Sequence, residues 1–118
     1  MTQQTGEASP SIEKNGQTLI ARMPMKLLDD ELLKTVGRMI DEAAAADAKI
    51  SLVVLDLSQV SFIPSMGLGL LVQMASKCKS RQQTLKLAAA QPSLRQVFAI
   101  TRLDRLFQFA DSVDAAMG

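Results

Sequence analysis

The stretch SLVVLDLSQVSFIPSMGLGLL at residues 51–71 constrains the fold more than any other part of this sequence. Its four consecutive aliphatic residues predict a strand covered on both faces, as in a parallel or mixed sheet that lies under helices. Asp56 ends this run, and a polar loop leads to Ser65, where glycines and apolar residues at helical spacing begin. The segment therefore predicts a strand over 50–56, then a loop, then a helix over 65–79.

The rest of the sequence predicts further strands and helices around this unit. Asn15-Gly16 lies between two short runs and predicts a β-hairpin, because both residues tolerate positive φ. Asp29 or Asp30 can cap a helix, and Pro92 suits the first turn of another. Further strands are expected over 11–14, 17–21, 84–89 and 106–109, and a last helix capped by Asp111 or Ser112. The predicted fold is α/β, with a mixed central β-sheet, the element order ββαβαβαβα and helices packed on the sheet.

The amino-acid composition argues against several classes of function. The chain has no histidine and a single cysteine, which excludes an intramolecular disulfide, thiolate-rich zinc sites and Ser-His-Asp catalysis. We therefore expect no enzymatic activity, no cofactor and no metal site. A net charge of +1 and the absence of Trp and Tyr argue against binding to nucleic acid. No apolar segment approaches the ~20 residues that cross a bilayer, so we expect a cytoplasmic protein without direct membrane insertion.

The element order, together with DLSQVSFIPSMGLGLL and the later SLRQVFAITRLDRLFQFADSVDAAM, resembles the STAS domain family, in particular the small bacterial anti-sigma factor antagonists. The resemblance covers about residues 10–117. It implies one STAS-like domain over 10–118, and the polar start of the chain indicates a flexible tail over 1–9. The function it implies is binding to an ATP-binding serine-kinase-type anti-sigma factor, which frees a sigma factor.

The family motif also implies a regulatory site, from which this chain departs. In the family, a strand ends in Asp-aliphatic-Ser and the next helix opens with Asp-Ser-Ser/Thr-Gly-aliphatic-Gly, whose second hydroxyl is phosphorylated by the cognate kinase. The residues DLS at 56–58 and GLG at 67–69 match this pattern. Between them Pro64 stands at the aspartate position, Ser65 at the first hydroxyl and Met66 at the phosphoacceptor. A thioether cannot accept a phosphoryl group, so the switch is either absent or moved to Ser65.

The resemblance places the partner-binding surface on the loop, the start of the following helix and the neighbouring segment 23–26. The predicted partner-binding residues are Asp56, Ser58, Pro64, Ser65, Met66, Gly67, Gly69, Met23 and Met25. Ser65 is the phosphorylation candidate. The identity of the partner, the isomer of the Pro64 peptide bond and the oligomeric state are left open by the sequence.

Several of these residues also have a purely structural interpretation. Ser65 can be only the N-cap of its helix, and Met66 can point into the core or be exposed. Asp56 suits hydrogen bonds to neighbouring backbone N–H groups better than general-base chemistry, because no partner acid or histidine is evident. Gly67 and Gly69 permit either close packing of the helix on a strand or close approach of a partner.

Two features beyond the loop have alternatives of the same kind. Cys78 lies on the apolar face of the predicted helix, which favours a buried, inert thiol over a reactive one. Lys77, Lys79 and Arg81 either face an acidic partner or form the solvated end of that helix, where the dipole favours cations.

Two other functions are weighed against the antagonist. One is a non-catalytic STAS subunit of an ABC-type lipid transport complex, attached to the membrane through a partner. The other is a small enzyme with Ser58 or Ser65 as nucleophile, which is disfavoured because neither serine has a histidine or an evident lysine base near it in the sequence.

Overall fold

The computed structural model describes residues 9–118, so the tail expected over residues 1–9 lies, apart from Ser9, outside the described residues. This part of the chain forms the predicted order of elements, ββαβαβαβα. Its strands are Ser11–Asn15 (β1), Thr18–Arg22 (β2), Leu52–Asp56 (β3), Thr84–Ala88 (β4) and Gln108–Ala110 (β5). Its helices are Asp30–Ala46 (α1), Ser65–Ser80 (α2), Pro92–Ile100 (α3) and Val113–Met117 (α4), with a short 3-10 helix at Leu103–Leu106 (η2).

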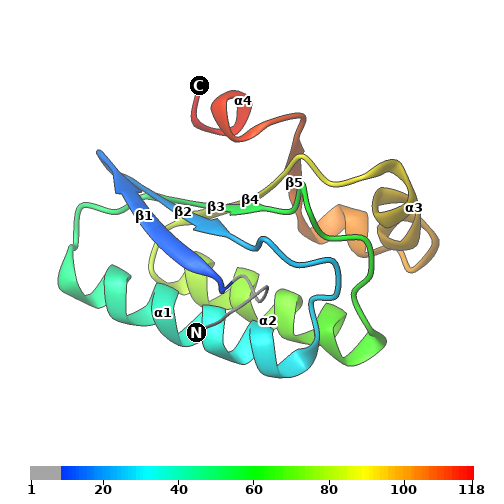
Figure 1. The fold of residues 1–118 in the computed structure, drawn as a ribbon. Coiled ribbons are helices and arrows are strands. Elements are labelled where there is room, and N and C mark those ends of the chain that lie inside the picture. The colour runs from blue at the N-terminus through cyan, green and yellow to red at the C-terminus, as the bar shows by residue number, and fades with distance from the viewer. Residues whose placement is uncertain (1–8) are drawn as a thin grey trace, which may run out of the picture.

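The five strands form one sheet in which they follow one another in sequence order (Figure 1). β1 and β2 pair antiparallel, whereas β2, β3, β4 and β5 pair parallel to their neighbours. The predicted mixed sheet is therefore confirmed. Each parallel connection contains a helix, and the carboxyl ends of β2, β3 and β4 share one edge of the sheet. The loop from β3 to α2 leaves from this edge.

The sheet is covered on both faces. α1 and α2 lie side by side on one face, and α4 lies on the other (Figure 1). Val53 and Leu55 belong to the larger core, which includes residues of α1, α2 and α3, whereas Val54 belongs to a smaller core with α4. All three side chains are fully buried. The unbroken aliphatic run of β3 thus reflects burial of both faces, as predicted.

Several predicted helix starts are confirmed. The Leu32 N–H donates to Asp29 Oδ1 at 2.9 Å, which makes Asp29 the N-cap of α1, and Ser112 caps α4 in the same way. Pro92 occupies the first turn of α3. Cys78 is fully buried in α2, where burial raises the pKa of its thiol, so the expected buried position is also confirmed.

Two predicted boundaries are wrong by one or two residues. The hairpin turn consists of Gly16 and Gln17, because Asn15 and Thr18 form the last residue pair between β1 and β2. Gly16 has a φ of 62°, so the glycine alone supplies the positive φ that the turn requires. The last strand begins at Gln108, because the Leu106 that we placed in it belongs to η2.

No helix within residues 9–118 has the length and apolar character needed to span a membrane.

Candidate functional site

The β3–α2 loop is fixed where it leaves the sheet. Asp56 accepts a hydrogen bond from the Ser58 N–H, with 3.0 Å between the nitrogen and Oδ1. The other carboxylate oxygen lies 3.1 Å from Arg22 Nη1. The predicted loop-stabilising role of Asp56 is therefore confirmed, and Arg22 is an ion-pair partner that the sequence analysis missed. Arg22 and Asp56 are also neighbours in the register of β2 and β3, which accounts for their contact.

The middle of the loop is tied to the segment between β2 and α1. The N–H groups of Ser61 and Phe62 donate to the Lys26 carbonyl at 2.8 and 3.1 Å, and the Leu28 N–H donates to the Phe62 carbonyl at 3.0 Å. Leu27 and Phe62 form an isolated parallel bridge. These bonds satisfy backbone groups that would otherwise need water, and they hold the two segments together as one surface.

Helix α2 begins without a side-chain cap. Pro64 is its N-cap residue, with a φ of −62°, and Ser65 is its first helical residue. The interpretation of Ser65 as the N-cap is therefore wrong, because a proline with an extended backbone already occupies that position. The first turn contains no acidic residue. The positive end of the helix dipole thus lies beside an exposed serine with no carboxylate in that turn. The peptide bond before Pro64 is trans.

The two glycines of the motif differ in their surroundings. A Cβ at Gly67 would lie 2.9 Å from Ile63 Cγ2 and 3.0 Å from Leu33 Cδ1. Gly67 therefore allows close packing, although the contact is with the loop and α1 rather than with a strand. Gly69 is exposed, and a Cβ there would meet nothing within 4 Å.

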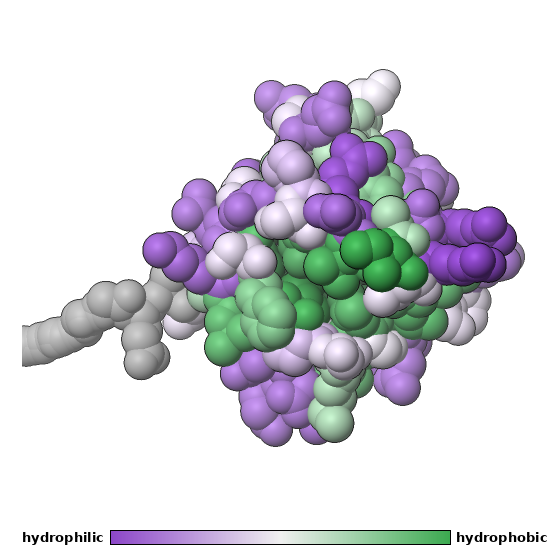
Figure 2. Space-filling view, turned by 90° about the vertical axis from the view of Figure 1, so that its right-hand side faces the viewer, coloured by the Kyte–Doolittle hydropathy of each residue, from purple (hydrophilic) through white to green (hydrophobic). Residues whose placement is uncertain are grey.

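Three large apolar side chains are exposed around the start of α2: Leu27 (47%), Phe62 (59%) and Met66 (67%). We call these three residues the apolar patch. The exposed alternative for Met66 is thus confirmed. Figure 2 faces the end of the molecule that lies on the right in Figure 1, where α3 and the start of α2 lie, and shows apolar side chains gathered across the middle of this face. Surface groups of this kind, surrounded by polar residues, are typical of protein-binding sites.

The structure brings most of the predicted partner-binding residues together along the β3–α2 loop and the first turns of α2: Asp56, Ser58, Pro64, Ser65, Met66, Gly67 and Gly69. Met25 is half-buried nearby in the chain. The predicted place of Met23 on the binding surface is corrected. Met23 is only 1% exposed, and its side chain belongs to the larger core. It continues the alternation of Leu19 and Ala21 along β2, which places it on the inner face.

Leu27 lies outside the predicted binding surface, and Phe62 lies in the predicted loop but was not named among the binding residues. The signal that could have identified Phe62 is an aromatic residue within a predicted loop. Nothing in the sequence separates Leu27 from the neighbouring Leu28, of which the structure buries only the second.

Comparisons with known proteins agree with the fold and with the resemblance. A profile of the STAS domain matches residues 9–116. BtrV of Bordetella bronchiseptica, named as a candidate anti-sigma factor antagonist, is 35% identical over 74 residues, which are 63% of this chain and 64% of BtrV. This match thus spans less than two thirds of that relative.

Two solved structures share the fold. A candidate anti-sigma factor antagonist from Thermotoga maritima has a TM-score of 0.76 at 24% identity, over 92% of this chain and 91% of its own. An anti-sigma-factor antagonist (STAS) domain protein from Planctomyces limnophilus has a TM-score of 0.79 at 21% identity, over 93% of this chain and 96% of its own. Since the family profile also spans nearly all of the described residues, the chain belongs to the STAS domain family.

Proposed function

We propose that this chain is an anti-sigma factor antagonist that binds an ATP-binding serine-kinase-type anti-sigma factor and thereby frees a sigma factor. The observation that carries the proposal is the apolar patch at the start of α2, directly beside the residues that match the family's regulatory motif. Family membership and the similarity to proteins named as antagonists support the class of function. The kinase type of the partner is inferred from the resemblance in sequence.

The apolar patch has the physical properties of a binding site. Full burial of a side chain such as Phe62 or Met66 against a partner contributes about 1.5–3 kcal/mol. The loop that carries Phe62 is held by backbone hydrogen bonds to Lys26 and Leu28, so binding requires little additional ordering of the chain. Met66 is flexible and adapts to an irregular partner surface. The patch is thus suited to constitutive binding.

A single substitution tests this surface. Met66→Asp leaves the fold intact, because the side chain is 67% exposed, but places a charge in an interface that loses its water. We expect the affinity for the anti-sigma factor, measured by calorimetry, to fall at least about tenfold. The matched control is Leu106→Asp in η2, which alters a side chain of similar exposure (54%) outside the patch.

Unchanged affinity of Met66→Asp would place Met66 outside the interface. Capture from extract of the source cells provides a wider test, since it requires no prior choice of partner. Recovery of a kinase-like or sigma-related protein supports the antagonist. Recovery of an ATPase and a permease instead would favour the transport subunit and contradict the proposal.

If the cognate kinase acts on this chain, we expect it to phosphorylate Ser65. A phosphate there would lie at the uncapped N-terminus of α2, where the helix dipole stabilises negative charge, while repelling a partner docked on Met66. Incubation with the kinase and ATP, followed by intact-mass measurement and peptide mapping, should leave the protein unmodified or modified at Ser65 only. Phosphate at Ser58 or Thr101 would contradict this expectation.

A further inference from the structure

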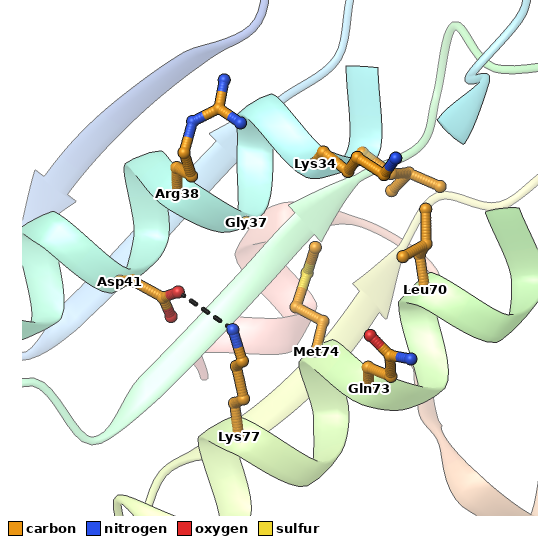
Figure 3. A pocket seen from close by; sticks show the side chains of 9 residues that line it. Lys34, Gly37, Arg38, Asp41, Leu70, Gln73, Met74 and Lys77 are labelled. Atoms are coloured by element: carbon orange, nitrogen blue, oxygen red, sulfur yellow. Dashed lines mark hydrogen bonds and ion pairs between the residues drawn. The ribbon is translucent and has the colours of Figure 1, made fainter. Parts of the chain in front are cut away.

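A groove of about 240 Å³ lies between α1 and α2. Its floor is apolar and consists of Leu33 and Gly37 from α1 and of Leu70 and Met74 from α2. Figure 3 shows Leu70 and Met74 reaching from α2 toward α1, with Met74 directed at the backbone near Gly37. An apolar cavity of about 150 Å³ is large enough to bind benzene, so this groove has room for a short hydrocarbon chain.

Gly37 lines the groove, although the packing of the protein does not require a glycine at this position. It lies in the middle of α1, where glycine lowers helix stability relative to alanine. A Cβ at this position would meet only Met74 Cε, at 3.8 Å, which is an ordinary van der Waals contact. Gly67 is different, because there the neighbouring side chains exclude a Cβ. Close approach of the helices therefore does not require glycine at position 37.

The rim of the groove is positively charged. It contains Lys34, Arg38 and Lys77, against Asp41 as the one carboxylate among the described lining residues. Asp41 already has two ion-pair partners. Lys77 Nζ lies 3.3 Å from one of its carboxylate oxygens (Figure 3), and Arg81 Nη1 lies 3.0 Å from the other.

The two cations of α1 have weaker partners. Lys34 has an exposed Glu31 at 4.0 Å. Arg38 donates to Thr35 Oγ1 at 3.4 Å and forms no ion pair within residues 9–118. Figure 3 shows the Arg38 guanidinium pointing away from α2, so Lys34 is the cation of α1 that can accept a further anion at the groove.

We propose that this groove binds an anionic amphiphile with an unbranched hydrocarbon tail, of which a medium-chain fatty carboxylate is the type. The tail lies on the floor formed by Gly37, Leu70 and Met74, and the carboxylate lies at Lys34. The groove runs along α1 from Lys34 to Asp41, which is about 10 Å at 1.5 Å per residue and matches a tail of about eight carbons. This site is separate from the antagonist function and does not depend on it.

Titration of the isotope-labelled full chain with decanoate, below the concentration at which it forms micelles, tests the proposal by two-dimensional NMR. Saturable shifts are expected at Gly37, Leu70 and Met74. Decyltrimethylammonium has the same tail with a cationic head, and we expect it to cause no saturable shift at these residues. Gly37→Leu places a large side chain on the floor of the groove and should lower the affinity for decanoate at least about tenfold. Lys34→Glu changes an exposed position and should lower this affinity about fivefold.

Matched controls separate this site from the rest of the surface. Lys79→Glu reverses a charge on α2 outside the groove, and Met66→Asp alters the apolar patch, so both should leave the decanoate affinity unchanged. The proposal is overturned by equal binding of the two amphiphiles, by undiminished affinity in Lys34→Glu, by shifts centred on Phe62 and Met66, or by the absence of saturable binding.

Discussion

Replacing Gly67 with alanine tests the contact of α2 with α1 by adding one methyl group. The new Cβ would lie 2.9 Å from Ile63 Cγ2 and 3.0 Å from Leu33 Cδ1. Both side chains are buried, and Ile63 Cγ2 is joined directly to a branched Cβ, so relief requires movement of the β3–α2 loop. Overpacking of this kind costs about 1–3 kcal/mol, while alanine improves helix propensity by up to about 1 kcal/mol. With the full gain in propensity, we expect a net loss of up to about 2 kcal/mol in the free energy of unfolding.

Gly37→Ala is the matched control, because it makes the same chemical change in the neighbouring helix. Its Cβ meets only Met74 Cε at 3.8 Å, so the gain in helix propensity remains and stability should rise by about 0.5–1 kcal/mol. Urea unfolding followed by far-ultraviolet circular dichroism measures both variants, since the chain has no Trp or Tyr for fluorescence. The midpoints should move in opposite directions with unchanged m-values. Equal or greater stability of Gly67→Ala relative to the unsubstituted protein would refute the packing argument.

Two further predictions concern single carboxylates. Asp29→Ala removes the N-cap of α1 and should lower the free energy of unfolding by about 1 kcal/mol, whereas Asp29→Asn keeps an acceptor and should lose much less; equal losses would show that the cap is not the cause. For Asp47, hydrogen bonds from the Lys14 side chain and the Lys49 backbone lower the pKa of the carboxyl. The stability from this carboxylate is therefore present above the unfolded-state pKa of about 3.9 and is lost as the pH falls through the lower folded-state pKa. Asp47→Asn should accordingly be less stable than the unsubstituted protein at about pH 7, and the difference should shrink from about pH 5 to about pH 2. A difference that does not change with pH would contradict this assignment.

The features that follow from local chemistry could be predicted from the sequence. The aliphatic run before Asp56 requires burial on both faces of a strand, and the structure places it at the centre of the sheet. Asp29 and Pro92 mark helix starts because capping and a fixed φ depend on only a few neighbouring residues. The predicted departure of Pro64 and Met66 from the motif that the resemblance implies likewise depends only on the residues themselves.

Tertiary packing decided which of these residues reach the surface. Met23 is buried and Leu27 is exposed, although both are apolar residues of one connecting region, because β2 extends its alternation inward while Leu28 takes the core position. The difference between Gly67 and Gly37 also depends on which atoms of the facing elements lie opposite each glycine. Spacing and propensity act over a few residues, whereas exposure and crowding are set by contacts between segments far apart in the chain. The sequence alone therefore determined the order and type of the elements, and only the fold determined the apolar patch and the groove.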